Sequence, residues 1–97
     1  MRLDVRRLAR PDLPGGDLIV SGLEDLEQGL ETVPALLVSI GAPRLRRLGY
    51  VVPRPIADPE HRLYALLARL DADTAHGRYN AWVRRLTSFE RAAECVR

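Results

Sequence analysis

The side chains whose types could carry out metal or acid–base chemistry are few, and three of them lie between positions 71 and 76. Asp71, Asp73 and His76 together could offer oxygen and nitrogen ligands to a divalent metal ion. Their spacing matches no strong metal-binding motif, and the two aspartates are explained by the turn and the helix start predicted there. We therefore predict no metal site and no cofactor.

A second pairing involves an arginine and the same histidine. Arg69 and His76 are separated by six residues, which resembles the Arg-x(4–6)-His signature of the HEPN family, a group of all-helical domains that includes ribonucleases. The resemblance implies that Arg69 and His76 form a catalytic pair, with His76 as general acid or base. It covers these two residues alone, and the arginine ends one predicted helix while the histidine begins the next. We assign no catalytic residue and keep a HEPN-like ribonuclease as a further alternative function.

A basic segment offers a different chemistry, the recognition of nucleic acid. Between residues 33 and 50, two short predicted helices flank Gly41, and the second carries Arg44, Arg46 and Arg47. In a helix-turn-helix the second helix enters the major groove, where arginines contact bases and phosphates. Two short core helices joined by a glycine would give the same pattern. A nucleic-acid-binding regulator that uses these arginines is therefore the alternative function.

The basic residues are unusual, because all 15 are arginine and none is lysine. Guanidinium groups bind phosphates and carboxylates in bidentate geometry, but a GC-rich prokaryotic genome also enriches arginine. The net charge of +2 is too small to predict nucleic-acid binding by itself.

The single cysteine, Cys95, cannot form an intramolecular disulfide, and no apolar run approaches the roughly 20 residues that span a bilayer. We expect a cytoplasmic protein that does not enter a membrane.

The elements that must position these side chains are predicted from apolar spacing and helix caps. The first helix is expected within 17–31, with Asp17 and Ser21 as competing caps. Its buried stripe is Ile19, Leu23, Leu26 and Leu30. Further helices are expected at 44–48, closed by Gly49, at 59–70, capped by Asp58, and at 74–96. Residues 35–40 are either a short helix, with Thr32 as its cap, or a buried strand.

The last of these helices carries a regular apolar seam with spacings of 4, 3, 4, 3, 4 and 3. The seam residues are Ala75, Tyr79, Trp82, Leu86, Phe89, Ala93 and Val96. Such spacing places all seven side chains on one stripe of the helix, where they must meet a partner surface. Trp82 and Phe89 are too bulky for a two-stranded coiled coil and suit the core of a bundle.

The length of this helix raises the question of a second chain. It extends over about 33 Å, and every other predicted helix is about half as long. Either two helices pack along it in series, or a second copy covers one end. We predict that residues from Tyr79 to Val96 in the seam form a partner-binding surface or a core, and that the protein is a homodimer.

Domain organisation follows from the same pattern. Residues 1–16 are rich in arginine, proline and glycine and are expected to form a flexible basic arm, and residues 17–97 a single helical domain. Helices joined by short loops without a convincing pair of strands predict an all-α fold, a compact bundle of four to five helices with a long C-terminal helix.

The overall expectation is a small non-enzymatic interaction module that associates with itself and binds a partner protein. The first helix is acidic, whereas the segments 44–47 and 78–91 carry arginines. Two faces of opposite sign favour recognition of another protein or of an acidic surface.

Overall fold

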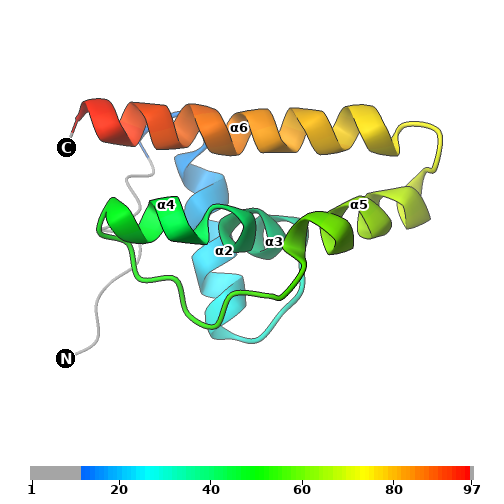
Figure 1. Cartoon of the computed structure of the whole chain (residues 1–97), viewed down its shortest axis with the longest axis horizontal. Helices are drawn as coiled ribbons and strands as arrows, with labels where there is room; N and C mark the ends of the chain where they lie inside the picture. Colours follow the sequence, from blue (N-terminus) through cyan, green and yellow to red (C-terminus); the bar gives the residue numbers. More distant parts are fainter. Residues whose placement is uncertain (1–11, 97) are drawn as a thin grey trace.

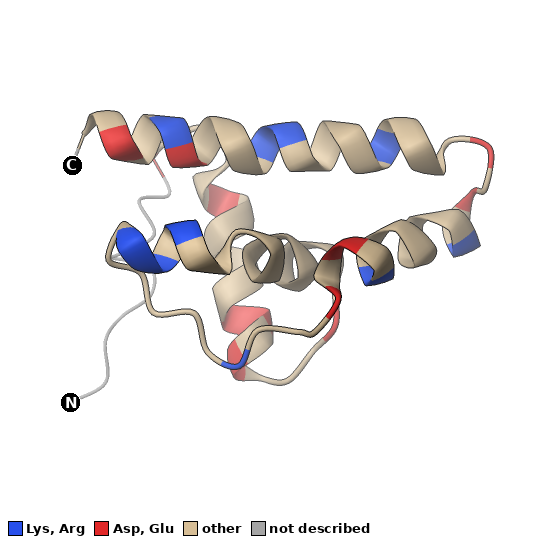
Figure 2. Cartoon of the chain, viewed as in Figure 1, with Lys and Arg blue, Asp and Glu red and all other residues tan. Residues whose placement is uncertain are grey.

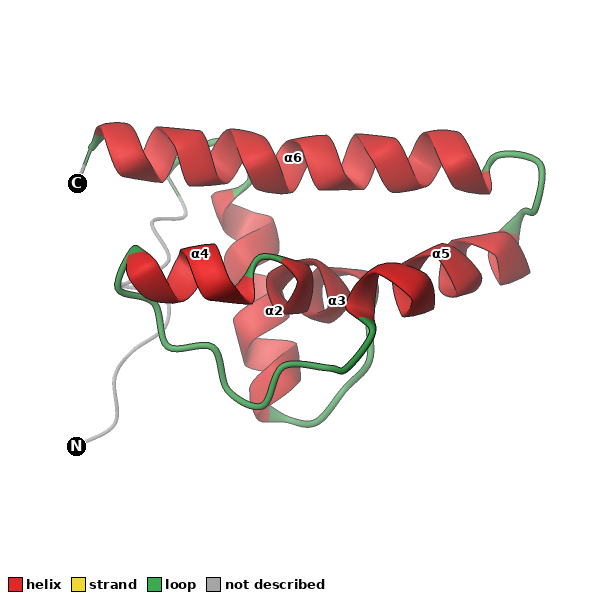
Figure 3. Cartoon of the chain, in the orientation of Figure 1, coloured by secondary structure: helices red, strands yellow, loops and turns green. Residues whose placement is uncertain are grey.

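The computed structural model describes residues 12–96, which form five helices and no strand (Figure 3). In chain order these are α2 (Gly16–Glu27), α3 (Val33–Ile40), α4 (Ala42–Arg47), α5 (Pro59–Leu70) and α6 (Ala75–Cys95). The predicted all-α bundle with a long C-terminal helix is confirmed. The predicted N-terminal arm lies largely outside the described residues. Within its last part, Leu13 packs against the core and Gly16 is buried.

The helices form two layers (Figure 1). Helix α6 runs along the long axis of the molecule, and α4, α3 and α5 lie in a row beneath it. Helix α2 passes behind α3 at a steep angle to α6, and α3 contacts each of the other described helices. The layers therefore meet around α3, which is the centre of the core.

The central position of α3 explains why its sequence leaves helix and strand undecided. Its residues from Ala35 to Ser39 are all buried, so neither helical nor strand periodicity is visible in the sequence. The local signals are those of a helix. The Thr32 hydroxyl accepts a hydrogen bond from the Ala35 N–H at 3.2 Å and donates one to Asp25 at 2.6 Å. The predicted helix start at Thr32 is thereby confirmed.

Helix α2 begins and ends earlier than predicted. Its N-cap is Gly15, and neither Asp17 nor Ser21 is the cap. A glycine is required there because φ is +76° and a Cβ atom would lie 3.1 Å from the Arg85 carbonyl oxygen of α6. The helix stops at Glu27, so the prediction that Leu30 belongs to the buried stripe is wrong, and its exposed fraction is 45%.

The segment between α4 and α5 is an extended connector that closes the core. Tyr50 and Val52 are buried, and the Tyr50 ring lies 5.9 Å from that of Phe89. The Ser39 hydroxyl accepts a hydrogen bond from the Ile56 N–H at 3.0 Å. Asp58 then precedes α5 as predicted, but its side chain makes no cap hydrogen bond because its backbone is left-handed, with φ of 49°.

Most of the seam on α6 is intramolecular core. Ala75, Leu86, Phe89 and Ala93 are buried at 0%, 4%, 0% and 5% exposure within one chain. Helix α5 covers the first half of α6, and α3, Gly41 and the start of α2 approach the second half (Figure 1). Segments of the same chain thus cover the long helix in series, so its length by itself requires no second chain.

The remaining seam residues are less covered. Tyr79 and Trp82 are half-buried against the core, and Val96 at the end of the helix is 49% exposed. The homodimer stays a prediction. If it forms through the seam, these three side chains are the ones that remain accessible to a second copy.

Candidate functional site

Two of the three arginines predicted to read nucleic acid are engaged within the chain. On α4, Arg44 Nη2 lies 2.8 Å from Glu94 Oε1, and its Nε donates to the same oxygen at 2.9 Å. Arg46 Nη2 donates to the Val52 carbonyl at 3.0 Å. These contacts join α4 to α6 and to the connector, while Arg47 remains exposed.

The geometry of this segment also differs from a helix-turn-helix. In that motif a turn of three or four residues joins the two helices. Here Gly41 alone separates α3 from α4. A Cβ atom at Gly41 would lie 2.9 Å from Glu90 Oε2, so the glycine permits the close approach of α6. The segment 33–50 therefore contributes mainly to the core and to the contact with α6.

Glu90 is the buried carboxyl of this junction. Its side chain is 8% exposed and lies 3.6 Å from Arg44 Nη1. Burial raises the pKa of Glu90 above its usual value, and the positive charge of Arg44 opposes that rise without cancelling it. The pair positions α4 on α6, and the Glu90 carboxyl is itself covered from solvent.

Arg69 and His76, the pair that resembles a ribonuclease motif, have different neighbours. The charge of Arg69 lies near enough to Glu31 to help lower the pKa of that carboxyl, after the larger effect of the hydrogen bond from Arg62. The His76 ring instead lies 3.3 Å from the Asn80 side-chain amide. Both side chains are exposed, and within residues 12–96 no hydrogen bond or ion pair joins them.

The predicted turn before α6 has a structural explanation. Asp71 accepts a hydrogen bond from the Asp73 N–H at 3.1 Å, and Thr74 precedes the helix without a side-chain cap. Among residues 12–96 no group of three or more histidine, cysteine or acidic side chains is placed to hold a metal ion.

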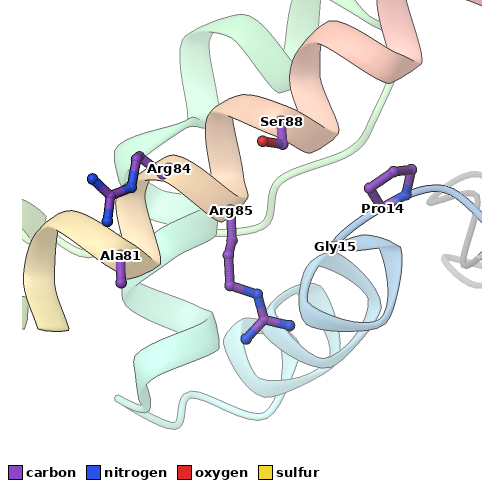
Figure 4. Close-up of a pocket in the computed structure, with 6 residues that line it drawn as sticks. All are labelled: Pro14, Gly15, Ala81, Arg84, Arg85 and Ser88. Atoms are coloured by element: carbon purple, nitrogen blue, oxygen red, sulfur yellow. The ribbon is translucent and has the colours of Figure 1, made fainter.

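The outer side of α6 carries a surface that lies beside the seam and shares Trp82 with it. Arg78, Ala81, Trp82 and Arg85 line an open groove of about 290 Å³. An adjoining hollow of about 490 Å³ shares Ala81 and Arg85 with it and reaches the start of α2 (Figure 4). We call these six residues of the helix the α6 face: Arg78, Ala81, Trp82, Arg84, Arg85 and Ser88.

The α6 face combines an aromatic side chain with available positive charge. The Arg85 guanidinium lies over the Trp82 ring, 5.0 Å from its centroid. Within the described residues, Arg78, Arg84 and Arg85 form no ion pair with a carboxylate, in contrast to Arg44. Figure 2 shows the arginines of α6 spaced along the helix.

Sequence reasoning placed Trp82 in the seam, as core or as partner-binding surface, and did not group it with the arginines beside it. The signal was present in residues 78, 81, 85 and 88, whose spacings are 3, 4 and 3, with residue 82 four positions after 78 and three before 85. That stripe lies beside the seam, and Trp82 belongs to both.

The chain was compared with known proteins. No protein-family model, curated protein or solved structure matches it. In the described part of the chain, no helix has both the length and the apolar character needed to cross a membrane. Function is therefore inferred from the surface itself.

Proposed function

We propose that this protein is a non-enzymatic interaction module that binds another protein through the α6 face. The observation that supports the proposal is the half-buried Trp82 in an open groove beside Arg78 and Arg85. Tryptophan and arginine are enriched among the residues that contribute most to binding energy at protein interfaces. The groove is open and shallow, which suits a protein surface better than an enclosed small-molecule site.

The rest of the molecule supports a scaffold role for the other helices. The charged contacts of Arg44 and Arg62 join α4 to α6 and α5 to the loop after α2. The core is filled by leucine, isoleucine and valine side chains, together with Phe89. These elements hold the backbone of α6 in place, so that the helix does not have to become ordered when a partner binds to its outer side.

A photo-crosslinking amino acid at Ala81 tests the proposal. Ala81 is exposed at the centre of the α6 face, and Ala65 on α5 is an exposed alanine outside it. We expect a protein from the source cells to be crosslinked from position 81 and not from position 65. That protein is identified by mass spectrometry, purified and titrated against the unmodified chain.

Two matched variants test whether the purified partner binds at the α6 face. Ala81→Glu is expected to weaken binding of the purified partner about tenfold or more, because it places a carboxylate among three arginines and blocks the groove. Ala65→Glu adds the same charge to another exposed helix position and is expected to leave binding unchanged. Equal affinity of both variants would contradict the proposal, as would the absence of any specific partner.

A further inference from the structure

The α6 face has a defined order of charge and apolar surface. Arg78 and Arg85 are seven residues apart, so they lie on the same side of the helix about 10 Å apart along its axis. Ala81 and Trp82 lie between them and line the same groove. The surface therefore presents positive charge, an apolar centre and positive charge again over two helical turns.

The hollow beside this groove broadens the surface at one end. Pro14 and Gly15 form its far wall, and Ala81 and Ser88 are small residues of α6 that line it. Figure 4 shows Arg85 extending toward the first turn of α2, while Arg84 points to the other side. Two guanidinium groups thus lie on either side of an accessible strip of the helix.

We propose that the α6 face receives an acidic amphipathic helix of a partner protein. This inference rests on the proposed function and names the kind of partner. Two carboxylates seven residues apart on the partner helix match the separation of Arg78 and Arg85, since the rise per residue is the same in both helices. An apolar side chain between them packs on Trp82 and Ala81 in the helix-in-groove mode, which is read at positions i, i+3 or i+4, and i+7.

The positive α6 face attracts carboxylates, and those of another protein are more available to it than the carboxylates on α2 of a second copy. The acidic residues in the second half of α2 and in its loop are engaged within the chain. Asp25 accepts a hydrogen bond from Thr32, Glu31 forms an ion pair with Arg62 at 2.9 Å, and Glu24 and Glu27 also make interactions. A second copy would have to break such contacts before it could present these carboxylates.

The same surface is less suited to nucleic acid. Single-stranded nucleic acids are bound in positively charged grooves that follow the backbone over several nucleotides. Here the positive charge is limited to three arginines around an apolar centre, and the chain carries a net charge of only +2. Guanidinium groups spaced by an apolar patch match an amphipathic acidic helix more closely.

The experiment uses two capped, alanine-rich helical peptides as probes. One has glutamate, leucine and glutamate at positions i, i+4 and i+7, and the other has glutamine in place of both glutamates. Because Trp82 is the only tryptophan of the chain, its fluorescence reports occupation of the groove directly. Anisotropy of a fluorophore on the peptide gives the same affinity independently.

We expect the glutamate peptide to change the fluorescence of Trp82 and to bind about tenfold or more tightly than the glutamine peptide. Ala81→Glu should weaken binding of the glutamate peptide about tenfold, and Ala65→Glu should leave it unchanged. Both are exposed alanines in helices, so circular dichroism is expected to report the same fold for the two variants.

Several results would overturn the inference. The first is equal affinity for the two peptides, and the second is no binding of the glutamate peptide at low salt. In either case the crosslinking experiment still reports whether the α6 face binds a protein at all. Tighter binding of oligodeoxythymidine than of the glutamate peptide would indicate that the α6 face binds nucleic acid rather than a partner helix. A dimeric mass in solution that Ala81→Glu returns to the monomeric mass would indicate that a second copy occupies the α6 face.

Discussion

Arg44 on α4 and Glu90 on α6 face each other across the junction of these two helices, with Nη1 and Oε1 3.6 Å apart. Glu90 is almost entirely withdrawn from solvent, and its pKa is raised because burial outweighs the attraction of Arg44. The two residues stand 46 positions apart in the sequence, and Gly41 provides the space that brings them together. Several properties of the protein depend on contacts of this kind.

The first prediction concerns pH. A carboxyl whose pKa is raised by folding stabilises the native state below its unfolded pKa, and that contribution is lost as the pH rises through the folded pKa. Wild-type protein should therefore lose stability relative to Glu90→Gln as the pH is raised from below the ordinary glutamate pKa of 4.5 toward neutrality. Urea unfolding of both proteins across this range measures the difference.

The comparison of two proteins isolates Glu90 from other groups. The pKa of Glu31 is lowered by its hydrogen bond with Arg62, which gives the opposite pH dependence, but it contributes equally to both proteins. A difference in stability that does not vary with pH would contradict the role assigned to burial of Glu90.

The second prediction compares two glycines. A Cβ atom at Gly22 would lie 2.7 Å from Val38 Cγ1 and close to the backbone of Pro34, so Gly22→Ala should reduce the free energy of unfolding by about 1–3 kcal/mol. At Gly77 of α6 nothing lies within 4 Å of the added atom.

Gly77→Ala is the matched control. An alanine inside an exposed helix is favoured over glycine, so the variant should gain about 0.5–1 kcal/mol. Chemical denaturation of both variants checks the pair. If Gly22→Ala were as stable as the wild-type protein, the close packing of α2 on α3 would be wrong.

The third prediction separates core from surface along the seam. Phe89 is completely buried within one chain, and Phe89→Ala should destabilise by about 3–5 kcal/mol. Val96 is half exposed, and Val96→Ala should change stability by less than about 0.5 kcal/mol. A large effect at Val96 that diminishes on dilution would indicate that a second copy covers it, because dilution dissociates the dimer.

The fourth prediction concerns the homodimer. Light scattering at tens of micromolar measures the mass directly, and the monomer has a mass of 10.9 kDa. If two copies associate through the exposed end of the seam, Val96→Asp should return the protein to the monomeric mass, because the carboxylate would be buried without a partner. A monomeric mass for the wild-type protein would exclude the dimer at that concentration.

Several elements were predictable because their signals are local. The helix starts at Thr32 and Asp58, the glycine after α4, and the long last helix all follow from caps, prolines and periodic apolar residues within a few positions. These features depend on the backbone conformation of neighbouring residues, which the sequence encodes directly. Local signals also led to error, since Leu30 continues the apolar spacing of α2 beyond the helix end.

The candidate site was less predictable, because exposure depends on what packs against each side chain. The arginines of the segment 44–47 looked available in the sequence, yet Arg44 and Arg46 are held by Glu94 and Val52. Trp82 looked like core, yet it lines an open groove. The apolar periodicity of the sequence does not show which arginines form hydrogen bonds or ion pairs with residues far away in the chain.

The sequence by itself determined that the chain is all-helical and that its last helix is the longest, since helical periodicity and capping act over neighbouring turns. Only the tertiary structure decided which residues of that helix are covered. Helices α5 and α3, together with segments near Gly15, Gly41 and Tyr50, pack along it, and Ala75, Leu86, Phe89 and Ala93 are buried, while Trp82 stays accessible beside Arg85. Burial and ion pairing arise from segments far apart in the chain, and their arrangement is a property of the whole fold.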